Sequence, residues 1–423
     1  MATLRELFFT NTTTRHTVIR NGFWRSFSIG FNKLIRLLAI LLAARWLGPT
    51  LFGEYSYVVS LMTLAFIFSD WGINLLLTRD LQQKKDGNKV FSVALAAKLL
   101  INIAAAIVGL ALPFFVSGAP VILCSIIVAS MVVGNIRELF VNAIIARQRG
   151  ELEAIVSVLE GILTVFLIFT LLTGYRTGSG FALINLITNS AALVICIGLV
   201  YHWLGFRFKY VSPSEITLFL KAGLPLALFG IIGYIFFASD QLFIKHYLGI
   251  EQVGYYALAT RVIYAAQLLP SLIVSVLFPV ISRYATDRER LEPLFKKIFW
   301  LLVGIGALVA GIIFIAKPLL IIAAPQYLSA LPIVSGLSGI LIFMFPSVWL
   351  DSVLVALNKQ KQDFYLTFGA AGLNIILLFI LVQPYGFSGA VYATIISQAI
   401  NTVATYIYAW LVIQKIQPAK IMA

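Results

Sequence analysis

The sequence predicts an all-α integral membrane protein with about 12 transmembrane helices. Of its 423 residues, 61% are hydrophobic and only 11% are charged, whereas soluble domains carry about 25% charged residues. The apolar runs last about 18 to 25 residues, which suits helices crossing a bilayer and exceeds the length of barrel strands. Gly and Pro separate most of these runs, so each run is expected to form its own helix.

The predicted spans follow the apolar runs in order along the chain. They lie at residues 24–45, 55–77, 90–113, 120–146, 152–173, 181–202, 218–245, 253–281, 297–317, 331–357, 364–383 and 388–413. With the N-terminus in the cytoplasm, most loop Lys and Arg residues fall on the cytoplasmic side, and the other side holds only Arg45, Arg176, Lys245 and Lys317. This bias predicts that both termini are cytoplasmic. It also accounts for the net charge of +14 without nucleic acid.

A short pattern occurs twice. L-G-x-x-x-[FV]-G-x-Y occupies residues 47–55 and returns at 248–256, an offset of 248 − 47 = 201 residues, close to half the chain. The chain is therefore interpreted as two related halves of six helices that enter from the same side, which makes the repeat parallel. Each copy is predicted to be an extracytoplasmic hairpin turn, in which Gly48 and Pro49 end one helix and Gly53 permits close packing. Direct substrate contact is the alternative role.

The predicted domains follow from this duplication. They are a cytoplasmic N-terminal tail (1–22), an N-terminal six-helix bundle (23–202), a cytoplasmic linker (203–217), a C-terminal six-helix bundle (218–413) and a cytoplasmic C-terminal tail (414–423).

Five basic residues lie inside the predicted spans, where a charge at the bilayer centre costs about 2.5–3.5 kcal/mol. Such residues are expected to face an aqueous cavity or to be paired, and a cationic cavity attracts phosphate or carboxylate. We therefore predict that an anionic headgroup is bound by Lys33, Arg36, Lys98, Arg137 and Arg261.

Structural alternatives remain open for some of these residues. Arg137 can pair with the adjacent Glu138 or extend to the cytoplasmic face. Arg261 is equally compatible with either role. Lys33, Arg36 and Lys98 have no acidic neighbour at helical spacing, which favours a cavity-lining role.

Two carboxylates inside spans, Asp70 and Asp240, are predicted as ion-coupling sites because intramembrane carboxylates can relay ions. Asp70 also lies near Arg79 and can instead form a structural pair with it. The polar side chains offer no cluster with metal-ligand spacing, and Cys124 and Cys196 lie within apolar runs, so neither a metal, a cofactor nor a disulfide is predicted. Short outer loops without a carboxylate pair or nucleophile predict that the protein is not an enzyme.

The chain resembles the oligosaccharide/polysaccharide flippases of the multidrug/oligosaccharidyl-lipid/polysaccharide (MOP, MATE-like) exporter superfamily, over nearly its whole length. The resemblance rests on residues 45–55, Asp70-Trp71-Gly72 and Arg79 in the first half. In the second half it rests on Asp240, the pattern at 248–256 and Arg261.

The resemblance implies two bundles in a V shape, alternating access and coupling to H+ or Na+. The implied cargo is an oligosaccharide on a polyprenyl pyrophosphate, such as an O-antigen, lipopolysaccharide, capsule or exopolysaccharide repeat unit, which crosses the cytoplasmic membrane. Membrane lipids and a polysaccharide polymerase are the other implied partners. The alternative interpretation is a multidrug/cation antiporter of the same fold, for which an acidic cavity is expected. A membrane polysaccharide polymerase or ligase is a third, weaker interpretation.

Overall fold

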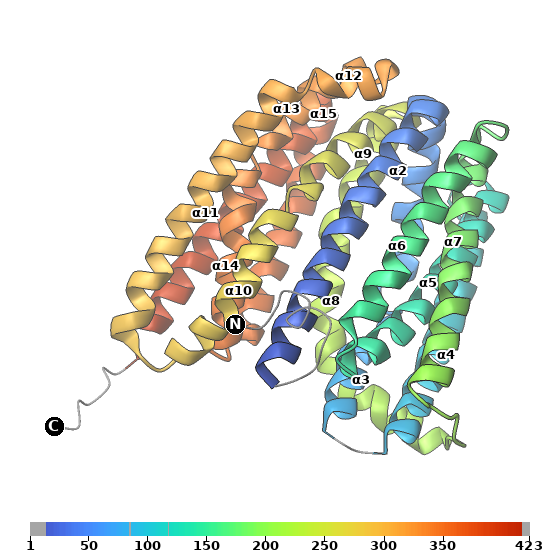
Figure 1. Cartoon of the computed structure of the whole chain (residues 1–423). Coiled ribbons are helices and arrows are strands. Elements are labelled where there is room, and N and C mark those ends of the chain that lie inside the picture. The colour runs from blue at the N-terminus through green and yellow to red at the C-terminus, as the bar shows by residue number, and fades with distance from the viewer. Residues whose placement is uncertain (1–13, 84–85, 117, 417–423) are drawn as a thin grey trace. The chain divides into compact units, whose positions relative to one another are not determined.

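The computed structural model describes residues 14–83, 86–116 and 118–416, and every regular element in these ranges is a helix (Figure 1). The described chain forms two compact units. The first comprises residues up to Leu47 together with Glu54–Tyr234, and the second comprises Gly48–Gly53 together with Ile235–Ala423. Most of both predicted tails lies outside the described residues. The all-helical membrane fold predicted from composition is confirmed.

The helices of the first unit run in chain order through the N-terminal half. They are α2 (Thr14–Ala65), α3 (Ile73–Gln82), α4 (Gly87–Ala111), η1 (Leu112–Phe114), α5 (Val121–Ala146), α6 (Gly150–Leu167), η2 (Ile168–Leu172), α7 (Gly178–Gly198), η3 (Leu199–Trp203) and the first part of α8 (Pro213–Leu248). The single turns η2 and η3 are π-helical and continue α6 and α7.

The second unit holds the remainder of α8 and the helices that follow it. They are α9 (Ile250–Ala265), α10 (Leu268–Tyr284), α11 (Arg288–Ala316), α12 (Leu319–Ala323), η4 (Pro325–Ala330), α13 (Leu331–Ser338), α14 (Leu341–Ala356) and α15 (Gln360–Gln414).

Within the described residues, eight helices are long and apolar enough to cross a membrane, or nine when the bent pair formed by η4–α13 and α14 counts as one span. Two of them contain a sharp break and carry two predicted spans each. α2 breaks at Gly48 (φ 72°) and α15 breaks at Gly386 (φ 56°). A positive φ has little steric cost at glycine, so these residues can reverse the chain.

The predicted span 55–77 is wrong in one respect, because it is not a continuous helix. α2 ends at Ala65 and α3 begins at Ile73, and between them Trp71 (φ 48°) and Gly72 (φ 69°) take left-handed conformations. The Trp71 indole donates a hydrogen bond of 2.9 Å to the carbonyl of Leu220 on α8. Gly223 also fits against this turn, since an added Cβ would lie 2.4 Å from the Trp71 carbonyl oxygen. Close packing by α8 thus accompanies a turn where hydropathy alone predicted helix.

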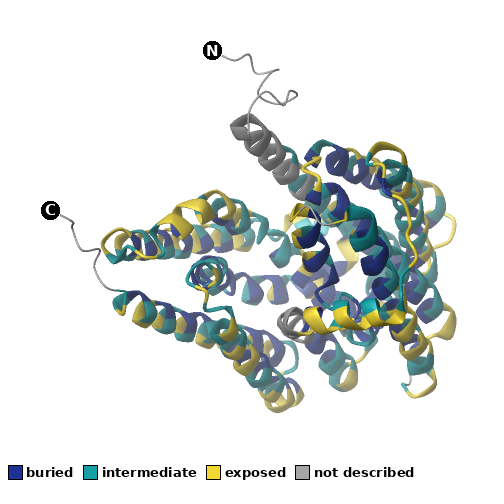
Figure 2. Ribbon diagram, turned by 90° about the horizontal axis from the view of Figure 1, so that it is seen from below, coloured by how far each residue is buried: buried dark blue, intermediate teal, exposed yellow. Residues whose placement is uncertain are grey.

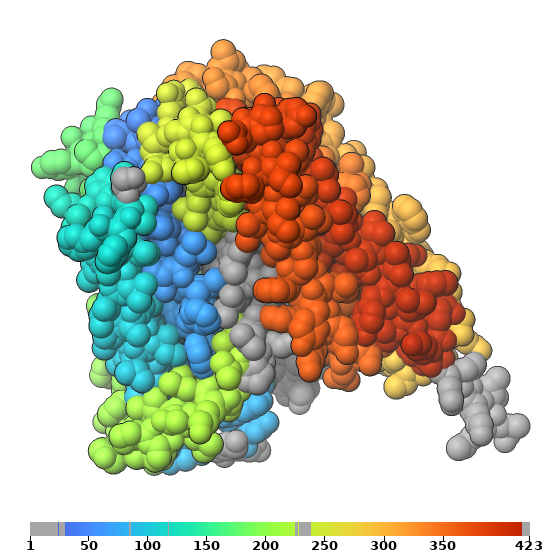
Figure 3. All heavy atoms as spheres, turned by 180° about the vertical axis from the view of Figure 1, so that it is seen from behind, coloured from blue at the N-terminus to red at the C-terminus, as the bar shows by residue number. Residues whose placement is uncertain are grey.

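Many helices carry buried positions on one side and exposed positions on another (Figure 2). Large apolar side chains occupy many of the exposed positions. The two arms of α15, orange to red in Figure 3, expose Ile376, Phe379, Ile400 and Val403. Lipid tails are as apolar as these side chains, so such exposure is expected of a membrane-facing surface.

The predicted linker at 203–217 is docked on the first unit. The Lys209 ammonium lies 2.6 Å from a carboxylate oxygen of Asp86, and the Lys89 ammonium lies 2.8 Å from that of Glu215. The hydrogen bond from Lys209, followed by that from the Lys89 backbone N–H, lowers the pKa of Asp86 below its usual value. Phe206 is buried beside Phe91. The two compact units divide further along, between Tyr234 and Ile235 inside α8.

Candidate substrate and ion sites

A three-residue charged cluster joins α2, α5 and α6 of the first unit, and we call it the arginine clamp: Arg36, Arg137 and Glu160. Arg137 Nη1 lies 2.5 Å from Glu160 Oε2, and Arg36 Nη2 lies 3.9 Å from Glu160 Oε1. Each carboxylate oxygen thus faces one guanidinium. Two cations and one anion leave a net positive charge inside an apolar helical bundle.

Glycine packing brings the clamp together. A Cβ on Gly161 would lie 2.9 Å from Ile35 Cγ2 and 3.2 Å from Phe31 Cε1, so only the absence of a side chain lets α2 approach α6 this closely. Arg36 and Glu160 are neighbours in sequence of Ile35 and Gly161, so the close approach of α2 and α6 brings their long side chains within reach of each other.

The two arginines of the clamp differ in exposure. The Arg137 side chain is 14% exposed and Glu160 is 9% exposed, whereas the Arg36 side chain is 63% exposed. The Nε atom of Arg137 is buried and finds no hydrogen-bond partner in the described structure. Arg137 therefore holds Glu160 from inside the bundle, whereas most of the Arg36 side chain stays exposed. The predicted alternative that Arg137 pairs with Glu138 is wrong, since Glu138 is exposed and Arg137 pairs with Glu160.

Lys98 on α4 is fully buried, and its ammonium lies 2.8 Å from Asp70 Oδ1. Lys98 has no acidic neighbour at helical spacing on α4, as the sequence indicated, but its partner Asp70 comes from a separate segment. The predicted pairing of Asp70 with Arg79 is wrong, because the Arg79 guanidinium contacts Asp80 instead. Asp70 sits in the turn before α3, which places it beside α4. Asn102 donates to the backbone carbonyl of Lys98, one turn along the same helix.

Two of the predicted cations stand apart from these pairs. Lys33 is half-buried on α2 and forms no ion pair with the described residues. Arg261 is exposed on α9 of the second unit and likewise has no ionic partner in the described ranges. Of the predicted headgroup residues, contacts in the structure therefore join only Arg36 and Arg137, through Glu160.

Asp240 forms the main buried polar site of the second unit. Its side chain is 2% exposed, and Tyr256 donates a hydrogen bond of 2.5 Å to Oδ2, with Thr394 Oγ1 3.2 Å from the same oxygen. Oδ1 is buried and accepts no hydrogen bond within the described chain. The network continues along α15, because Ser397 donates to the carbonyl of Thr394 at 3.1 Å and Asn374 donates to Ser397 Oγ at 3.3 Å. A buried carboxylate with one oxygen unsatisfied can take up a proton or a small cation.

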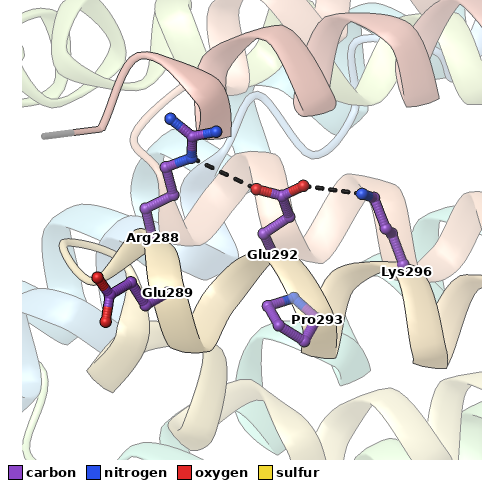
Figure 4. Close-up of a pocket in the computed structure, with 5 residues that line it drawn as sticks. All are labelled: Arg288, Glu289, Glu292, Pro293 and Lys296. Atoms are coloured by element: carbon purple, nitrogen blue, oxygen red, sulfur yellow. Dashed lines mark hydrogen bonds and ion pairs between the residues drawn. The ribbon is translucent and has the colours of Figure 1, made fainter. Parts of the chain in front are cut away.

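The second unit also has a cavity of about 530 Å³ at the start of α11. It is lined by Arg288, Glu289, Glu292, Pro293 and Lys296. The Glu292 carboxylate lies 3.4 Å from Arg288 Nε and 2.8 Å from the Lys296 ammonium (Figure 4). Because the two cations are balanced by two glutamates, this cavity is a poor receptor for an anion.

Sequence reasoning named the arginines of the clamp but gave Glu160 no role. A signal was available, because Glu160 lies well inside the predicted span 152–173, whose only other charged residue, Glu153, is next to its start. A carboxylate inside a span implies a cation on a neighbouring helix. Tyr256 and Thr394 could not be connected with Asp240, since they lie on separate helices.

Helical bundles that bury charges between helices and expose apolar residues outward are those of a multi-pass membrane protein. The sequence model of a family described as "Polysaccharide biosynthesis protein" matches residues 18–285, more than half of the chain. The protein belongs to this family.

Known proteins resemble the chain in sequence and in fold. It is 25% identical over 399 residues to Agl15 of Haloferax volcanii, described as a "probable low-salt glycan biosynthesis flippase", covering 88% of this chain and 79% of Agl15. The lipid II flippase MurJ, in an inward closed conformation, superimposes with a TM-score of 0.71 at 18% identity, covering 91% and 87% of the two chains. An inward-facing multidrug resistance MATE transporter of the MOP superfamily gives a TM-score of 0.65 at 15% identity, covering 94% and 96%. The two structures establish the MOP fold.

Proposed function

We propose that the protein is a flippase that moves a polyprenyl-pyrophosphate-linked oligosaccharide across the cytoplasmic membrane by alternating access, with both termini in the cytoplasm. The observation that carries this proposal is the net positive arginine clamp inside the first bundle. A guanidinium binds phosphate oxygens through a planar fork of donors. Family membership and the similarity to Agl15 support a glycan lipid as the cargo.

Within this proposal, Arg36 is the first contact for the pyrophosphate, because its side chain is the more exposed of the two arginines. Lys33 lies three residues earlier on the same helix and therefore on a neighbouring part of its surface. Lys98 and Arg261 remain predicted contacts. Lys98 can reach a ligand only if its pair with Asp70 opens, since its side chain is 0% exposed.

The experiment is transport by the purified full-length protein in liposomes, with a fluorescent polyprenyl-pyrophosphate glycan whose exposed fraction is read from dithionite bleaching. Arg36→Gln should slow translocation at least tenfold, because a charged hydrogen bond is worth about 1.5–3 kcal/mol. Glu138→Gln, an exposed change on α5, is the matched control and should leave the rate unchanged. Wild-type protein that does not move this lipid would refute the proposal.

We further propose that Asp240 couples transport to a proton or to Na+. Its support is the unsatisfied Oδ1 atom inside a set of hydroxyl and amide groups. Asp240→Asn removes the charge and nearly preserves the shape. Transport by this variant should lose its response to an imposed pH or Na+ gradient, and a fully gradient-sensitive variant would contradict the coupling role.

The same assay separates the flippase from a multidrug antiporter, which the MATE fold also allows. Multidrug cargo is mostly cationic, so a net positive clamp opposes it electrostatically. Gradient-driven uptake of a cationic dye, without movement of the glycan lipid, would favour the antiporter.

A further inference from the structure

A pair of asparagines on α7 of the first unit, Asn185 and Asn189, is absent from the predicted headgroup site and uses its amide nitrogens as donors to the helix backbone. The Asn185 amide nitrogen donates to the carbonyl of Phe181 at 2.9 Å, and that of Asn189 donates to the carbonyl of Asn185 at 2.9 Å. A backbone carbonyl can only accept, so these bonds fix which end of each amide is nitrogen. The Oδ1 atoms therefore point away from the helix backbone.

Both amide nitrogens also contact neighbouring helices. The Asn189 nitrogen lies 3.3 Å from Ser130 Oγ on α5, and the Asn185 nitrogen lies 3.5 Å from the Tyr55 hydroxyl on α2. Gly134 makes room for Asn189, because a Cβ there would lie 3.4 Å from Asn189 Oδ1. The donors of both side chains are thus used inside the bundle.

The two Oδ1 atoms remain available as acceptors. Neither oxygen accepts a hydrogen bond from the described residues. Neither oxygen is fully buried, since both side chains are partly exposed. Four residues separate them, which places them on one face of α7 about 6 Å apart along the axis. This is a pair of acceptors without donors, and its natural complement is a ligand that carries hydroxyl groups.

The pair lies in register with the arginine clamp. Asn189 contacts Ser130, and Arg137 follows Ser130 by seven residues on the same face of α5, about 10 Å along the axis. Asn185 lies one turn further from the clamp, towards the predicted extracytoplasmic end. The positively charged arginine clamp and the two neutral amide oxygens therefore follow one another along the contact between α5 and α7.

We infer that Asn185 and Asn189 form a sugar subsite, which accepts hydrogen bonds from hydroxyl groups of the glycan while the arginine clamp holds its pyrophosphate. The inference rests on the proposed flippase function and specifies which part of the cargo each site contacts. A bound cation is the other ligand for amide oxygens. It is disfavoured here because both amides are neutral and the neighbouring clamp is net positive.

The test compares two lipids on the full-length protein in nanodiscs: undecaprenyl pyrophosphate, and undecaprenyl pyrophosphate linked to N-acetylglucosamine. Asn185→Leu and Asn189→Leu should each weaken binding of the sugar-bearing lipid about tenfold, the loss expected for one hydrogen bond to a well-placed acceptor. Binding of the sugar-free lipid should stay within twofold of wild type.

Asn142→Leu on α5 is the matched control, since Asn142 makes the same amide-to-carbonyl bond one turn back, to Glu138 at 2.8 Å, and has no part in the subsite. It should change binding of neither lipid. Equal losses for both lipids in the Asn185 and Asn189 variants would overturn the inference, because they would mean a structural role. Sugar-lipid binding that still requires Na+ in an Asp240→Asn background would also overturn it, because the cation would then bind at the asparagines. Wild-type protein that binds neither lipid would instead refute the proposed flippase function.

Discussion

The arginine clamp makes a quantitative prediction about stability. Glu160→Gln removes the only carboxylate that the described structure places against Arg137, whose side chain is 14% exposed and whose Nε atom already lacks a partner. Breaking a buried ion pair by removing one partner costs about 3–5 kcal/mol, because the other charge stays buried and unpaired. An intramembrane charge alone costs about 2.5–3.5 kcal/mol on insertion scales, which agrees with that range. We therefore expect Glu160→Gln to lower the free energy of unfolding by about 4 kcal/mol.

The contribution of Arg36 should be much smaller. Its side chain is 63% exposed and its contact with Glu160 is 3.9 Å, so Arg36→Gln should cost at most about 1 kcal/mol, as exposed pairs do. The double change Glu160→Gln with Arg137→Met should recover most of the loss, since an apolar replacement of a whole buried pair is often neutral.

The assay is equilibrium unfolding of the purified protein in mixed micelles of detergent and dodecyl sulfate, followed by helical circular dichroism. Glu138→Gln is the control for a neighbouring exposed glutamate and should stay within about 0.5 kcal/mol of wild type. A double variant as unstable as Glu160→Gln alone would refute the argument. So would an Arg36→Gln variant as unstable as Glu160→Gln.

Three other predictions follow from single contacts. Gly254→Ala should prevent correct folding, because its Cβ would lie 2.0 Å from the Pro49 carbonyl oxygen. Gly304 has open space around it, so Gly304→Ala should instead stabilise α11 by about 0.5–1 kcal/mol in thermal unfolding. Asp240→Asn should fold normally yet bind no Na+ in isothermal calorimetry, if Na+ is the coupling ion. The hydrogen bond from Lys209 lowers the pKa of Asp86 in the folded protein. Linker docking is therefore complete above the usual carboxyl pKa of about 3.9, and it is lost as the pH falls through the lowered pKa of Asp86. Hydrogen exchange of the linker amides in the native protein, corrected for its intrinsic pH dependence, should stay constant from pH 8 to about pH 5. Lys209→Gln should raise this exchange over the whole range. Release of the linker near pH 6 would contradict the assignment to Asp86.

Composition predicted the fold class because burial in lipid leaves a strong, local signal. Every predicted span falls on helices of the described chain, but three spans are interrupted: 55–77 before α3, 253–281 between α9 and α10, and 331–357 at the bend between α13 and α14. These breaks were missed because hydropathy records how apolar a segment is and carries no information on backbone φ. The left-handed Trp71 accompanies a bond to Leu220, 149 residues away.

Charge pairing was harder to predict for a related reason. Helical spacing shows which side chains share a face of one helix, but partners on different helices depend on how each helix is rotated about its axis. Lys98 and Asp70 are 28 residues apart, and Arg137 and Glu160 are 23 residues apart. No periodicity connects such residues. What the sequence does provide is the count of charges inside spans, from which the need for partners follows.

The repeated turn shows how far a sequence pattern can reach once packing is known. Gly48 and Gly249 take nearly the same backbone conformation, with ψ of 173° and 174° and positive φ in both. Within the second unit the two copies also contact each other reciprocally. A Cβ on Gly53 would lie 2.1 Å from the carbonyl oxygen of Ile250, and a Cβ on Gly254 would lie 2.0 Å from that of Pro49. Gly53 is thus confirmed as a close-packing residue. The second glycine of the pattern is required in both copies, because each copy packs against the other.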